Sequence, residues 1–137
     1  MMELQINPDR LADFVTLLLP QLAGAQSKTA LWFYAPLDLP LAAQAIGSAS
    51  PFIGSSGILA GHGYLLDLSL ETAQALSAFL AHDTQALSAL THLEVEVSGQ
   101  LQFCAYDHFT VLIPGDALHP PWFAALAEQE ILVLPGQ

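Results

Sequence analysis

HLEVEVSGQLQFCAYDHFTVLIP, residues 92–114, is the stretch of sequence that decides the fold. Apolar and polar residues alternate on both sides of Ser98-Gly99, which is the pattern of a half-buried β-hairpin. A two-residue loop would place apolar residues opposite polar ones, so we predict a loop with an odd number of residues. A loop over 97–99 gives glycine the left-handed third position, and a loop over 98–100 leaves the same residues on each face.

The two faces of this hairpin are predicted to differ in character. The loop over 97–99 pairs Val95 with Leu101 and Leu93 with Phe103, which makes one face apolar and turns it toward the core. The other face is predicted to point outward. It carries the even-numbered side chains of both strands, with Asp107 and His108 following at the strand end: His92, Glu94, Glu96, Gln102, Cys104 and Tyr106.

The rest of the chain mixes helices and strands without regular β-α-β alternation. Cap residues and helical spacing predict helices that begin at Asn7-Pro8, Ser69, Asp83 and Pro120, with a short one over 39–46. Strands are expected over 29–35, 109–113 and 131–134, and 58–67 is either a second hairpin or one strand with a bulge. We predict an α+β fold, a largely antiparallel sheet with helices packed on one face, as a single compact domain over residues 1–137.

Charge is the unusual feature of the composition. Thirteen residues are acidic and two, Arg10 and Lys28, are basic, which gives a net charge of −11. An acidic field repels phosphates, so no nucleic-acid or anionic-membrane partner is expected. Only 11% of the residues are charged, so part of the exterior is either weakly polar or covered by another chain, and we expect a homodimer.

The cellular location is expected to be cytoplasmic. The single cysteine, Cys104, excludes an internal disulfide, and the N-terminal residues lack the pattern of a signal peptide. The stretch 39–66 has no charged residue, but its two prolines and five glycines make it a poor membrane-spanning helix.

The outward face of the hairpin is the candidate ligand or partner face. A cysteine near a histidine is the minimum for an activated thiolate, and His92, Glu94 and Cys104 together could bind a divalent metal. A solvated strand face with a buried, inert cysteine is the simpler interpretation, so we assign no catalytic residue, metal or cofactor. Asp107-His108 resembles a carboxylate–imidazole pair, although a turn that uses Asp107 for local hydrogen bonds is the simpler interpretation.

No catalytic motif is recognisable elsewhere in the sequence. The glycine-rich segments at 54–57 and 61–63 lack the spacing and the lysine of a phosphate-binding loop. The aromatic residues of 32–34, with Trp122 and Phe123, are expected in the core, and Trp122 becomes an interaction hot-spot candidate only if it is exposed.

Three functions are compatible with these features. The first is a non-catalytic acidic binding protein that recognises another, possibly basic, protein, with immunity proteins and secretion chaperones as analogues in size and charge alone. The second is a small-molecule or metal site, or an enzyme, on the 92–108 face. The third is a structural domain that associates only with itself. We expect the first and lean against an enzyme.

Overall fold

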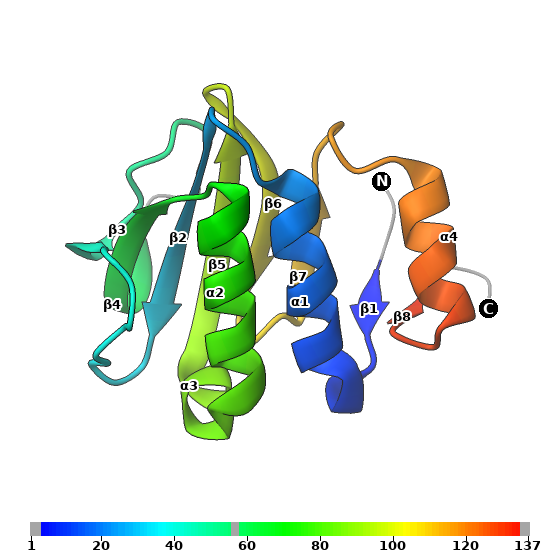
Figure 1. Ribbon diagram of the computed structural model, residues 1–137, viewed down its shortest axis with the longest axis horizontal. Coiled ribbons are helices and arrows are strands. Elements are labelled where there is room, and N and C mark those ends of the chain that lie inside the picture. The colour runs from blue at the N-terminus through cyan, green and yellow to red at the C-terminus, as the bar shows by residue number, and fades with distance from the viewer. Residues whose placement is uncertain (1–3, 56–57, 135–137) are drawn as a thin grey trace.

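A six-stranded antiparallel sheet is the centre of the computed structural model, which describes residues 4–55 and 58–134. Helices α1 (Leu11–Leu22) and α2 (Leu70–His82) lie side by side on one face of it (Figure 1). The predicted α+β class is confirmed. In spatial order the strands are β3 (Gln44–Ala49), β4 (Ile58–Asp67), β2 (Ser27–Phe33), β5 (Leu90–Val97), β6 (Gln100–Tyr106) and β7 (Val111–Pro114).

Strand β2 is buried on both faces from Thr29 to Phe33, as the nearly continuous apolar sequence of this part predicts. Leu31 and Phe33 belong to the main core with α1 and α2, whereas Ala30 and Trp32 belong to a second, smaller cluster on the opposite side of the sheet. We call that side the second face. Phe52, from the loop between β3 and β4, completes the cluster there, so this loop covers part of the second face.

The predicted helix caps are confirmed. Asn7 accepts a hydrogen bond from the Asp9 amide at the start of a 3-10 turn (η1, Pro8–Arg10), and Ser69 accepts one from the Thr72 amide at the start of α2. Asp83 accepts from the Ala86 amide and begins α3 (Thr84–Ala89) where α2 has ended. Pro20 lies in the last turn of α1, which ends two residues later at Leu22.

The short helix predicted over 39–46 is wrong. Residues 44–49 form β3, which pairs with β4, and the Trp32 indole donates to the Gly47 carbonyl at 3.0 Å. A Cβ at Gly63 would collide with the Gly47 carbonyl and the Trp32 indole. This close approach makes pairing with β4 the better state for a segment with weak helical preference. Residues 58–67 form one strand, β4, and not a second hairpin.

The predicted register of the central hairpin is also wrong. Ser98 and Gly99 form a two-residue loop with φ of 52° and 81°, the signs of a type I′ turn, and Val97 pairs with Gln100. The register then shifts between Val95–Phe103 and Glu96–Leu101, which leaves an extra residue in β6. This bulge turns Leu101 toward the second face, whereas Leu93, Val95 and Phe103 face the core as predicted.

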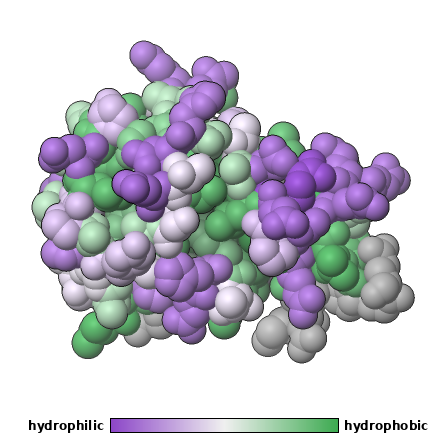
Figure 2. Space-filling view, turned by 90° about the horizontal axis from the view of Figure 1, so that it is seen from below, coloured by the Kyte–Doolittle hydropathy of each residue, from purple (hydrophilic) through white to green (hydrophobic). Residues whose placement is uncertain are grey.

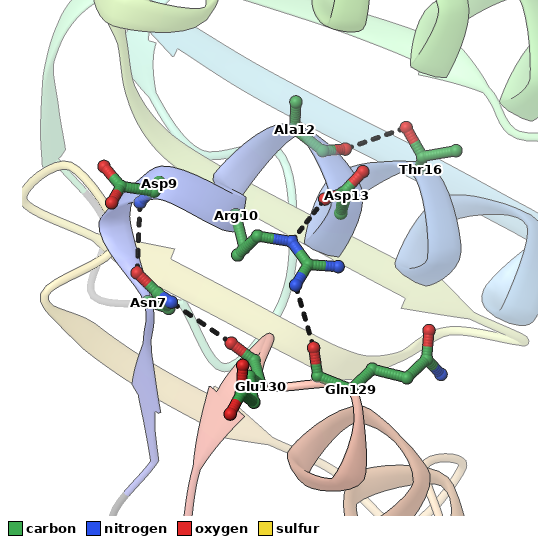
Figure 3. Close-up of polar contacts among 8 residues, drawn as sticks. All are labelled: Asn7, Asp9, Arg10, Ala12, Asp13, Thr16, Gln129 and Glu130. Atoms are coloured by element: carbon green, nitrogen blue, oxygen red, sulfur yellow. Dashed lines mark hydrogen bonds and ion pairs between the residues drawn. The ribbon is translucent and has the colours of Figure 1, made fainter.

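The C-terminal segment forms a small unit beside the sheet, with helix α4 (Pro120–Glu128) and strand β8 (Leu132–Val133), which pairs with β1 (Gln5–Ile6). Figure 3 shows how this unit is attached to the start of α1. Arg10 donates to the Gln129 carbonyl at 2.8 Å and pairs with Asp13 at 2.6 Å, and the Asn7 side chain donates to the Glu130 carbonyl at 3.2 Å. Within the described residues, no helix is long and apolar enough to cross a membrane.

Candidate functional site

The candidate face is a buried layer between the sheet and the β3–β4 loop. Glu94 is wholly inaccessible, His92 is 9% exposed and Cys104 is 5% exposed. The expectation that these side chains point into solvent is therefore wrong. Strand periodicity placed them correctly on one face, but it could not show that residues 50–55 cover that face.

Glu94 is the centre of this layer, and three hydroxyl groups donate to its carboxylate. Ser50 donates to Oε1 at 2.5 Å, and Ser55 and Tyr106 both donate to Oε2 at 2.6 Å. The two serines come from the covering loop and the tyrosine from β6. Since a buried carboxylate is stable only when its oxygens are hydrogen-bonded, these contacts join the loop to the sheet.

His92 lies two residues before Glu94 on β5, and Tyr106 lies on the neighbouring strand β6, with the His92 and Tyr106 rings 5.9 Å apart. Burial raises the pKa of Tyr106, and hydrogen bonds with Cys104 and Glu94 raise it further, so the phenol keeps its proton. Burial lowers the pKa of His92 below its usual 6.5. The Nδ1 atom of His92 accepts the Asp107 amide at 3.2 Å, which requires that this nitrogen carry no proton.

Cys104 pairs with Glu94 across β5 and β6, and not with His92 as the predicted register implied. Burial raises the pKa of the Cys104 thiol, and the nearby Glu94 charge raises it further, although a hydrogen bond with Tyr106 lowers it. The surroundings therefore favour the thiol over the thiolate. An activated nucleophile needs the opposite environment, so the geometry does not support a thiolate mechanism.

The other predicted site residues lie outside this cluster. Glu96 is half-buried near the hairpin turn, and the Gln102 side chain accepts the Ala117 amide at 2.8 Å. Asp107 and His108 are exposed in the β6–β7 turn, where both have positive φ. Trp122 is half-buried, with its ring 6.1 Å from that of Phe14, so it packs against the core.

A shallow pocket of about 370 Å³ opens beside the buried cluster, between the β3–β4 loop and β7. Its lining includes Ser55, Cys104 and Tyr106 together with the apolar Leu101 and Ile113. Among the described residues, no three His, Cys, Asp or Glu side chains are placed to hold a metal ion. The volume of the pocket suits a small molecule, but the Ser55 and Tyr106 hydroxyls in its lining already donate to Glu94.

Sequence reasoning missed Ser50 and Ser55, which lie in the glycine- and serine-rich loop between β3 and β4. Phe52 was the available signal, since a large aromatic residue within such a loop indicates a packing position. It is 7% exposed, and its amide donates to the Ser50 hydroxyl at 3.1 Å. Comparison of this chain with protein-family models, curated proteins and solved structures found no match.

Proposed function

We propose that this protein is a non-catalytic binding protein that recognises another protein through a basic surface of that partner. The observation that carries the proposal is the charge of the exterior. In the described part of the chain, nine carboxylates are exposed and the Arg10–Asp13 contact is the only ion pair. Such an unneutralised exterior attracts a basic partner over long range and accelerates association.

The buried cluster supports a non-catalytic role. Its strongest acceptor, Glu94, is held by three hydroxyls of the same chain and has no exposed surface. These residues stabilise the covering loop, which is a structural task. Small acidic immunity proteins and secretion chaperones are analogues by size and charge only.

Affinity capture from the native cell at low and high salt tests the proposal. A tagged protein should retain a basic partner at about 0.05 M NaCl and lose most of it at about 0.5 M, because salt screens exposed charges. A matched variant, Asp38→Asn/Asp67→Asn/Glu71→Gln, should retain less partner at low salt. A partner that is acidic, or one held equally at both salt concentrations, would contradict the proposal.

A small-molecule site is the second candidate function, and the 370 Å³ pocket beside Cys104 and Tyr106 favours it. A ligand there would shield the thiol. Cys104 labelling by a thiol reagent at pH 7 should be slow in the folded protein and fast in urea. A compound that slows it further and raises the melting temperature would support the site, and fast labelling of the folded protein would contradict the burial of Cys104.

A homodimer and a cytoplasmic location remain parts of the proposal. Much of the exposed surface of α2 consists of small or uncharged residues, among them Gln74, Ala75, Ala78 and Ala81, which suit a weakly polar contact between copies. Light scattering over a dilution series should give twice the mass of 14.6 kDa. A constant mass of one chain at high concentration would exclude the dimer.

A further inference from the structure

A groove lies between the last strand of the large sheet and the C-terminal unit. Residues 110–115 form one side of it, Leu4 and Gln5 form another, and Leu118 and Phe123 contribute from the segment around α4. Its volume is about 610 Å³, and a second hollow of about 390 Å³ shares Gln5 and Thr110 with it. The second hollow therefore adjoins the groove just before the start of β7. In the view from below, hydrophobic surface is visible between groups of hydrophilic residues (Figure 2).

Among the described strands, β7 is the outermost one of the large sheet on the side of this groove. Among the described residues, it pairs with β6 and with no other strand. The Gly115 amide donates to the Gln102 carbonyl at 2.8 Å, in register with the β6–β7 pairs. Because hydrogen-bonded and non-hydrogen-bonded pairs alternate, Val111 and Ile113 bond to β6, and Leu112 directs both its N–H and its C=O toward the groove.

The side chains and charges around the groove favour an apolar segment with basic ends. Val111 and Ile113 are 44% and 51% exposed, which is unusual for β-branched residues on a strand. No acidic or basic residue is among the described residues that line the two hollows, and the nearest exposed carboxylates in the sequence are Asp107, next to His108, and Asp116, next to Gly115.

We propose that an extended segment of the partner protein adds to β7 as a further strand within this groove. At about 3.3 Å per residue, the stretch from Thr110 to Gly115 matches five or six residues. The segment would carry apolar residues opposite 111–113 and a lysine or arginine near each end. This inference rests on the proposed binding function and names its site and partner chemistry.

A segment fits this edge better than a second sheet does. Residues Leu4 and Gln5 and the α4 segment stand on the other side of the groove, so a single extended chain can enter where the edge of another sheet would be obstructed. Pro114 offers no N–H and ends the pairing after a few residues. Short edges that end in proline are also the natural protection against unlimited edge-to-edge association.

The backbone contact can be tested with a pair of variants at one position. Leu112→Pro removes the N–H that faces the groove and leaves the β6–β7 hydrogen bonds in place, whereas Leu112→Ala makes a similar loss of side chain but keeps the N–H. Random twelve-residue peptides, displayed on phage, would be selected against the wild-type chain. Selected peptides should be rich in lysine, arginine and β-branched residues. Their affinity for the Leu112→Ala variant should be within about threefold of their affinity for wild type. Their affinity for the Leu112→Pro variant should be at least tenfold lower than for wild type.

A charge control addresses the ends of the groove. The double variant Asp107→Asn/Asp116→Asn should weaken binding of the selected peptides several-fold more than Asp38→Asn/Asp67→Asn does. The second variant makes the same change in net charge elsewhere on the surface. Circular dichroism confirms that each variant is folded, and amide NMR shifts should place the bound peptide along 110–115. If Leu112→Pro does not fold, peptides with N-methyl groups on alternate amides provide the same test on wild type.

Three outcomes would overturn the inference: no peptide enriched above background, shifts that map to another surface, or equal binding by the two Leu112 variants. The failure of this inference and that of the proposed function are distinguishable. If a basic native partner is captured in a salt-dependent manner but binds the two Leu112 variants equally, the binding function stands and the groove is excluded as its site.

Discussion

Glu94 is the residue on which the second face of the sheet depends most. Replacement by alanine leaves three hydroxyls without their acceptor, and an unsatisfied buried polar group costs about 1–3 kcal/mol. We expect Glu94→Ala to lower the free energy of unfolding by about 3 kcal/mol in urea titration. Glu96→Ala, on the same strand but half-buried, should change it by less than about 0.5 kcal/mol. Equal effects of the two variants would contradict the role of the hydroxyl contacts.

His92 should make stability depend on pH. Its pKa is lowered in the folded protein, so the unfolded chain binds more protons between the two pKa values. The free energy of unfolding should therefore fall as the pH drops below about 6.5, as protonation also breaks the bond from the Asp107 amide. Urea titrations between pH 7.5 and 5 would measure this slope. The variant His92→Asn, which cannot titrate, should show a shallower slope, and an identical slope would exclude His92 as a source.

Residue-level prediction from the sequence was limited by distant partners. The strand period placed His92, Glu94, Cys104 and Tyr106 on one face, and the structure has them there. Their burial depends on Ser50, Ser55 and Phe52, which lie about forty residues earlier in the chain. No local pattern around 92–106 indicates that another segment covers the face, because alternation is the same for a solvated face and for one covered by a loop.

At the scale of elements, the pairing of β3 with β4 depends on a close approach at Gly63. A Cβ there would lie 2.6 Å from the Trp32 indole nitrogen and would also strike the Gly47 carbonyl. We expect Gly63→Ala to lower the free energy of unfolding by about 2 kcal/mol, within the range for overpacking. Gly24→Ala is the control, because its Cβ would meet only the Ser27 hydroxyl at 3.6 Å. Thermal unfolding followed by circular dichroism would measure both, and a stable Gly63→Ala protein would contradict the close approach.

Elements with local signals were predicted well, and those set by pairing were not. The caps at Asn7, Ser69 and Asp83 are visible in sequence because each side chain bonds to an amide two or three residues away. The bulge in β6 has no such signal. It lets a two-residue type I′ turn at Ser98-Gly99 coexist with an apolar core face, whereas a regular ladder would have required an odd loop.

At the scale of the whole molecule, the net charge of −11 should oppose compactness at low ionic strength. Raising NaCl from about 0.01 to about 1 M shortens the Debye length from about 30 to about 3 Å. The free energy of unfolding should rise by about 1 kcal/mol over this range, measured by thermal unfolding. Asp38→Lys/Asp67→Lys/Glu71→Lys changes the net charge from −11 to −5, since each replacement adds two charges, and it should respond less. A flat salt dependence of wild type would show that self-repulsion is negligible.

Because the centre of the sheet is covered on both sides, it also restricts the positions at which this protein can accept substitutions. At residues 29–33 of β2 and 92–95 of β5, neighbouring positions face different packed layers, so substitutions at odd and even positions there should be tolerated equally poorly. Surface variation is thus confined to the outer strands, the helix exteriors and the turns. New contacts with other molecules would have to arise at the margins of this fold, because its centre has no free side to offer.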